Sequence, residues 1–100
     1  MHLYARQGDL VIEKLDAPIS AELMEHTGLV LAGRGTSPHR VAGKVLAAQD
    51  GSTWLLRVPA AAAVSIEHSD RHNAVALEPG DYRIKPLRER GGNGDRAVED

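Results

Sequence analysis

Short apolar runs separated by turn-forming residues recur along the chain, and this pattern predicts β-strands. Asp9–Lys14 is a β-branched run, and Gly28–Gly33 holds an apolar run between two glycines. Arg40–Ala48 and Thr53–Val58 flank Gln49–Ser52, which contains Asp-Gly. Because Asp and Gly tolerate positive φ, these residues predict a hairpin.

The second half of the chain continues the pattern. Ala60–Ala63 favours helix by propensity, but the strict alternation in Val64–His68 predicts a strand that begins directly afterwards. Ala74–Leu77 and Tyr82–Lys85 are two further short strands, separated by the turn Glu78–Asp81. Turns every 8–12 residues predict a mainly β fold, a small single-domain barrel or sandwich of about 6–8 short strands.

At most one short helix fits this pattern. Pro18 suits the first position of a helix, and Ile19, Leu23 and Met24 could share one face, although a loop explains the segment as well. Gly91–Asp95 contains no apolar residue. We therefore expect one β-rich domain over residues 1–90 and a flexible polar tail over 91–100.

The composition limits how the core is built. The chain of 100 residues is 42% hydrophobic but contains no Phe, one Trp and two Tyr. The core must therefore consist of Leu, Val, Ile and Ala, and Trp54 is expected to be its one large residue rather than a ligand platform. Since a domain of this size buries a limited fraction of its surface, self-association is expected to support it.

Charge and cysteine content exclude several classes of function. The net charge of −2 gives no general attraction to nucleic acid or to anionic lipid, so neither is expected as a partner. The absence of cysteine excludes disulfides, thiolate metal sites and cysteine nucleophiles. The first six residues lack the apolar run of a secretory signal, and no run of about 18 apolar residues occurs, so we expect a cytoplasmic protein.

The histidines are the strongest candidates for chemistry, because imidazole is the commonest metal ligand. His39, His68 and His72 lie in or beside the expected turns, near Glu67 and Asp70. These three histidines are the predicted metal ligands, although none shows a diagnostic ligand spacing. The alternative is that they are solvated turn residues.

Other chemistry has less support. Ser37, Ser52, Ser65 and Ser69 lack a Gly-x-Ser-x-Gly elbow, and Gly33–Thr36 lacks the Lys-Ser/Thr of a phosphate loop. We therefore expect no enzymatic activity.

Positive charge gathers near the end of the chain. Arg83 and Lys85 alternate along the last expected strand, so they would share one of its faces. They could form a surface for an anion or a partner, or belong to a charged edge strand that resists aggregation.

Several segments resemble a family of small uncharacterised bacterial and phage proteins over nearly the whole chain. They are Arg6–Ile12, Val30–Val41, Trp54–Val58, Leu77–Ile84 with Arg88-Glu89, and Val98–Asp100. Members of the family start with Arg-Gln-Gly-Asp, carry a Gly-His-x-His loop and a His-Glu-Glu-His turn, and end with a Leu-Pro-x-Gly-x-Tyr strand. The resemblance implies a β-rich fold.

The paired histidines of that family would also imply a metal or pH-sensitive site. This chain departs from the pattern, because Ser37 replaces the first loop histidine and Ser69–His72 replaces the second motif. Only His39 and His72 of the four motif histidines remain, unless His68 or Glu67 substitutes.

A weaker resemblance links Asp9–Lys14, Gly28–Gly33 and Gly43–Gly51 to the first half of bacterial co-chaperonins. It would place Leu29 and Leu31 in the loop that docks on the chaperonin, in a ring-forming subunit. The Val-Gly-Asp-x-Val segment of the second half has no clear counterpart.

Taken together, these observations predict a non-enzymatic binding or structural accessory module with a protein partner or self-association, of the capsid-decoration type if phage-encoded and then located in the virion. A metal-binding or pH-sensing histidine site and a co-chaperonin-like subunit are the alternatives. No cofactor is expected, and the sequence does not indicate a small-molecule ligand.

Overall fold

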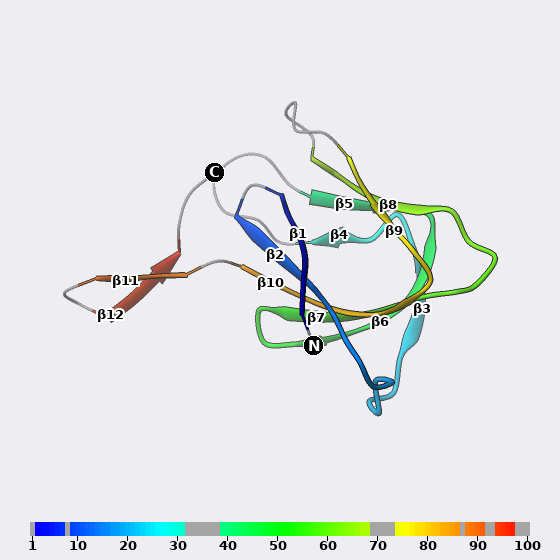
Figure 1. The fold of residues 1–100 in the computed structure, drawn as a ribbon, viewed down its shortest axis with the longest axis horizontal. Helices are drawn as coiled ribbons and strands as arrows, with labels where there is room; N and C mark the ends of the chain where they lie inside the picture. Colours follow the sequence, from blue (N-terminus) through cyan, green and yellow to red (C-terminus); the bar gives the residue numbers. More distant parts are fainter. Residues whose placement is uncertain are drawn as a thin grey trace.

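The computed structural model describes residues 2–7, 9–31, 39–68, 74–86, 88–91 and 94–97, and these contain strands but no helix (Figure 1). The strands are β1 His2–Gln7, β2 Leu10–Lys14, β3 Met24–Thr27, β4 Val30–Leu31, β5 His39–Ala42, β6 Lys44–Asp50, β7 Thr53–Val58, β8 Val64–His68, β9 Val75–Leu77, β10 Gly80–Pro86, β11 Arg88–Gly91 and β12 Gly94–Ala97. The mainly β fold class is confirmed. The described strands outnumber the 6–8 expected, because β1, β3, β11 and β12 were not predicted and Gly43 divides the strand expected over Arg40–Ala48 into β5 and β6.

The strands form a sandwich rather than a closed barrel. A six-stranded sheet has the order β1-β2-β10-β7-β6-β3, and a four-stranded sheet has the order β4-β5-β8-β9. All the described pairs are antiparallel. The β11–β12 hairpin projects away from both sheets (Figure 1).

The four-stranded sheet is a continuation of the larger one. The β3–β6 pair runs on into the β4–β5 pair, and the β7–β10 pair runs on into the β8–β9 pair. The first of these ribbons bends at Gly28 and Gly43, which have φ of 71° and 113°. Residues with side chains rarely adopt such values, so the two glycines allow the ribbon to turn from one sheet into the other.

Local predictions agree with most of this arrangement. The hairpin is confirmed, with Asp50 opposite Thr53 and Gly51 at φ 63°. The strand predicted over Val64–His68 is confirmed as β8, preceded by a turn and not by a helix. Residues 15–23 form a loop, the second of the two alternatives that Pro18 allowed, but Met24 opens strand β3, which neither alternative included.

The core lies between the sheets and consists almost entirely of aliphatic side chains. Its buried members are Leu10, Ile12, Leu31, Val41, Val45, Ala47, Leu56, Val58, Val64, Ile66, Leu77, Tyr82 and Ile84. The central aromatic residue is Tyr82, which packs edge-to-face on Tyr4 with ring centroids 5.2 Å apart and donates a hydrogen bond to the carbonyl of Glu78. Burial raises the pKa of the Tyr82 hydroxyl above its usual range, so the hydroxyl stays neutral. Trp54 is only partly buried and packs at the margin of this core.

One expectation about charge is wrong. The sequence allowed Arg83 and Lys85 to lie on an edge strand, but β10 lies between β2 and β7. Their side chains meet Glu13 of β2, with Arg83 Nε 2.9 Å and Lys85 Nζ 3.6 Å from Glu13 Oε1. Alternating charges do not distinguish an edge strand from a central strand whose outer face meets solvent.

The end of the chain contains the β11–β12 pair, in which Gly91 faces Gly94. The expected boundary between domain and tail at residue 90 falls inside this hairpin, and the division itself stays a prediction. The described part of the chain contains no helix long and apolar enough to cross a membrane.

We expect Gly43→Ala to lower the free energy of unfolding by about 2 kcal/mol or more. A Cβ there would lie 2.7 Å from the carbonyl oxygen of Ala63, in addition to the strain of positive φ. Gly28→Ala is the matched control, because its φ is also positive but no atom lies within 4 Å of the added Cβ. Its expected cost is about 1 kcal/mol. Urea unfolding measures both, and equal losses would contradict the steric argument.

Candidate functional site

Three polar side chains lie inside the sandwich, where β1 ends and β5 begins. Gln7 is the last residue of β1, Asp9 precedes β2, and His39 opens β5. Their relative exposures are 3%, 1% and 0%. We call these three residues the buried polar cluster. Side chains of this kind are costly to bury unless they bond to one another, so their hydrogen bonds account for their presence.

The hydrogen bonds of the buried polar cluster limit where its protons can lie. Gln7 Nε2 donates to the carbonyl of Ile66 at 2.8 Å, so its Oε1 accepts from His39 Nδ1, also at 2.8 Å. The other ring nitrogen, Nε2, lies 3.0 Å from Asp9 Oδ1. That contact needs a proton of its own, on the ring nitrogen or on the carboxyl group. The pair is therefore imidazolium with carboxylate or imidazole with carboxylic acid, and either form is neutral overall.

The burial of His39 contradicts its interpretation as a solvated turn residue and leaves the metal prediction open. The alternative of a solvated turn residue is wrong for His39, which is fully buried in β5. His68 ends β8, and its Cα faces that of His39 in the β5–β8 register. His72 lies outside the described residues, as does the side chain of His68. The metal prediction for these three histidines thus stays a prediction.

The described geometry limits how His39 could bind a metal ion. Both of its ring nitrogens lie within hydrogen-bond distance of protein oxygens, so a metal would have to displace Gln7 or Asp9. Within the described ranges, no three or more His, Asp or Glu side chains are grouped so that they could hold a metal ion.

A second polar arrangement lies on the outer face of the six-stranded sheet. Arg57 donates to both carboxylate oxygens of Asp81, from Nε at 2.9 Å and from Nη2 at 3.0 Å, and Nη2 also donates to the carbonyl of Ile19. The amide of Ile19 donates to Asp81 Oδ2 at 2.7 Å. These bonds hold the loop of residues 15–23 against β7 and β10.

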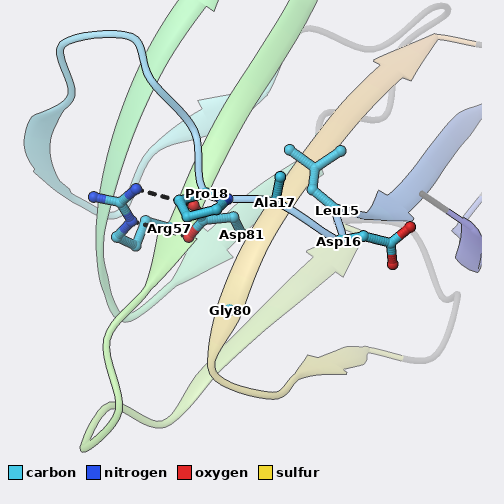
Figure 2. A pocket seen from close by; sticks show the side chains of 7 residues that line it. All are labelled: Leu15, Asp16, Ala17, Pro18, Arg57, Gly80 and Asp81. Carbon is cyan, nitrogen blue, oxygen red and sulfur yellow. Dashed lines mark hydrogen bonds and ion pairs between the residues drawn. The ribbon is translucent and has the colours of Figure 1, made fainter.

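The same loop borders an open pocket of about 330 Å³. Figure 2 shows Leu15, Asp16, Ala17 and Pro18 along the loop, beside Arg57, Gly80 and Asp81. The hydrogen bond from Arg57 lowers the pKa of Asp81 below its usual 3.8 and raises the pKa of Arg57. The carboxylate is therefore committed to a structural ion pair and does not act as a base near neutrality.

The segment that resembles a co-chaperonin docking loop is divided between core and surface. Leu31 is 1% exposed, whereas Val30 is half exposed. Residues 32–38 lie outside the described residues, and with them Gly33–Thr36 and Ser37.

Comparison with family models identifies the family. A model for a domain of unknown function, DUF8820, matches residues 6–86. The chain belongs to the DUF8820 family. This match confirms the resemblance to an uncharacterised family, while the bacterial or phage origin stays a prediction. No curated protein and no solved structure matches the chain.

The DUF8820 match covers the whole buried polar cluster and ends where β10 ends. Sequence reasoning singled out His39 but missed Gln7 and Asp9 as its partners. The sequence did contain one indication of these partners, because both polar residues lie within three positions of Leu10, where the apolar run of β2 begins. The Arg57–Asp81 pair gave no signal, because it depends on the β7–β10 register.

We expect Asp9→Ala and His39→Ala each to lower the free energy of unfolding by about 3–5 kcal/mol, because each leaves a buried polar group unpaired. The double variant should lose less than the sum of both. Asp9→Asn should lose less than Asp9→Ala, since an amide can donate to an unprotonated ring nitrogen. Lys44→Ala, which breaks an exposed pair with Glu25, is the control and should lose less than about 1 kcal/mol. Additive losses in a urea-unfolding cycle would argue against a coupled cluster.

The Arg57–Asp81 pair gives a pH dependence. Because the pKa of Asp81 is lower in the folded than in the unfolded chain, its stabilisation is present above about pH 4 and is lost as the pH falls. We expect the free energy of unfolding of the unmodified protein to fall more steeply than that of Asp81→Asn between about pH 5 and pH 2. Glu22→Gln, at an exposed carboxylate, should follow the unmodified protein. Parallel curves for all three would remove Asp81 from the explanation.

Proposed function

We propose that this DUF8820 domain is a non-enzymatic protein-binding or structural module that contacts its partners through the edges of its sheets. The large hydrophobic side chains exposed among the described residues support this proposal. They are Leu3, Met24 and Val30, with exposures of 60%, 69% and 48%. They lie on β1, β3 and β4, which are outer strands of their sheets.

Outer strands are suited to protein binding for a physical reason. An outer strand has a neighbour on one side, so every second residue directs its N–H and C=O groups away from the sheet. An extended segment of another protein can bond to these groups, while side chains beside the strand supply specificity. The apolar side chains of the domain are thus exposed where backbone groups can also form bonds.

The polar groups favour binding over catalysis. Gln7, Asp9 and His39 are buried and bonded to one another, and Arg57 and Asp81 hold a loop in place. His39, the one predicted metal ligand whose side chain is described, therefore takes part in hydrogen bonds that support the fold. Attachment to a larger particle, as in a capsid-decoration protein, is one form that such a module would take.

Site-specific photo-crosslinking in the native host tests this proposal. A benzophenone amino acid replaces Met24, Val30 or Leu3 in turn, and the same group at Ser52 is the control, because Ser52 is exposed in the β6–β7 turn. We expect adducts with defined proteins, including further copies of this chain, from the edge positions and none from position 52. Equal labelling at all four positions, or adducts at none, would refute binding through the sheet edges.

A further inference from the structure

The outer strands of the two sheets are not equally open. β1 is an outer strand of the six-stranded sheet and β9 of the four-stranded sheet, and Tyr4 of β1 donates a hydrogen bond to the carbonyl of Ala76 in β9 at 2.9 Å. These two edges therefore lie close to each other. The register of β1 also shifts between Leu3 and Ala5, and such a bulge hinders the addition of a strand.

The opposite edge consists of β3 and β4, which follow one another along a single ribbon. β3 bonds to β6 and β4 bonds to β5, and the described residues contain no strand on their other side. Leu29 accepts a hydrogen bond from Val41, so the alternation of an antiparallel pair turns the N–H and C=O of Val30 away from β5. Met24 and Val30 leave apolar surface exposed along this edge.

Within the described residues, the β3–β4 edge lacks several of the usual protections against strand addition. Natural edges are guarded by short strands, charged side chains such as Lys, Pro, bulges or a covering segment. Of these, short length applies here, since β3 has four residues and β4 has two. Neither β3 nor β4 contains Lys or Pro, and the β3–β6 and β4–β5 registers are regular. The one carboxylate, Glu25, is balanced by Lys44 of β6 at 3.4 Å. This edge can therefore accept another strand without bringing an uncompensated charge to it.

We propose that β3 pairs with β3 of a second copy of this chain, antiparallel about a twofold axis. The proposal rests on the proposed function and names one partner and one surface for it. The pairing would join the two six-stranded sheets edge to edge and bring Met24 of each copy under cover of the other.

The sequence of β3 selects the register. Residues that oppose each other across two strands share a face of the sheet, so a twofold axis perpendicular to the sheet must pass through a residue position. Two registers keep the pairing centred within β3. An axis at Glu25 sets two carboxylates directly against each other, which is destabilising. An axis at His26 sets Glu25 opposite Thr27 of the second copy, whose hydroxyl group can donate to the carboxylate.

The same register suits the exposed methionine. With the axis at His26, Met24 faces Gly28 of the second copy, and glycine presents no side chain there. In this register the edge therefore opposes no like charges, and Met24 meets a position without a side chain. A second copy would also add stability. The core of one chain is aliphatic apart from one central aromatic residue, and the dimer buries apolar surface that a single chain leaves exposed.

Light scattering coupled to size exclusion tests the dimer with the purified full chain. We expect twice the monomer mass of 10.7 kDa, and a return to the monomer mass for Met24→Lys. Leu3→Lys is the matched control, because Leu3 is similarly exposed on the other edge of the same sheet, and it should remain dimeric. A monomer at concentrations of about 1 mM, or a dimer that Met24→Lys leaves intact, overturns the proposal.

Single cysteines test the register, and the chain offers a background free of cysteine. Residues directly opposite each other have Cα atoms about 4.5–5.5 Å apart, within reach of a disulfide. We expect His26→Cys to oxidise to a covalent dimer and Glu25→Cys to do so much more slowly, because position 25 would lie more than about 7 Å from its own copy. A mixture of Glu25→Cys and Thr27→Cys should form the mixed disulfide. Far-ultraviolet circular dichroism verifies that each variant is folded.

The outcomes separate this proposal from the broader function. A dimer that cross-links at position 25 and not at position 26 overturns the register. A purified monomer whose edge positions cross-link to other proteins in the host overturns the dimer and leaves the protein-binding function standing. A monomer without edge adducts refutes both.

Discussion

The bend at Gly28 and Gly43 determines how this domain encloses a core. The β3–β6 pair continues into β4–β5, and the β7–β10 pair continues into β8–β9. If these ribbons could not turn, all the strands would extend as one flat sheet with one face in water. The bend brings Val41 and Ile66 of the smaller sheet over the inner face of the larger one, where Ile12 and Ile84 lie. Gly43 also has to be a glycine because the carbonyl of Ala63 occupies the place of its side chain.

Much of the fold was predictable from the sequence, because strand positions depend on local patterns. The alternation in Val64–His68 and the Asp50-Gly51 turn each identified their element correctly. The division into two sheets was not predictable in the same way. It depends on which strand pairs continue past a bend, and this follows from contacts between segments far apart in the sequence. The central position of β10 was missed for the same reason, since Arg83 and Lys85 would alternate identically on an edge strand.

The candidate site was predictable only in part. Histidine attracted attention for its chemistry, but the burial of His39 depends on Gln7 and Asp9, about 30 residues earlier in the chain. No spacing rule connects these residues, because β1 and β5 belong to different sheets and meet only when the sheets pack. The cluster gives the start of β5 a specific position, since each member has its bonding partner at one place in the core. Polar groups inside a small aliphatic core favour one arrangement of strands over others that would leave those groups unbonded.

The shared ribbons also have a consequence for cooperativity. β5 and β6 are separated by one residue, and two residues separate β3 from β4 and β9 from β10. Neither sheet is thus an independent folding unit, because separating the layers exposes a core to which both sheets contribute and strains the bends that connect them. Partial unfolding that preserves one layer alone is disfavoured, and the sandwich should melt in a single all-or-none transition.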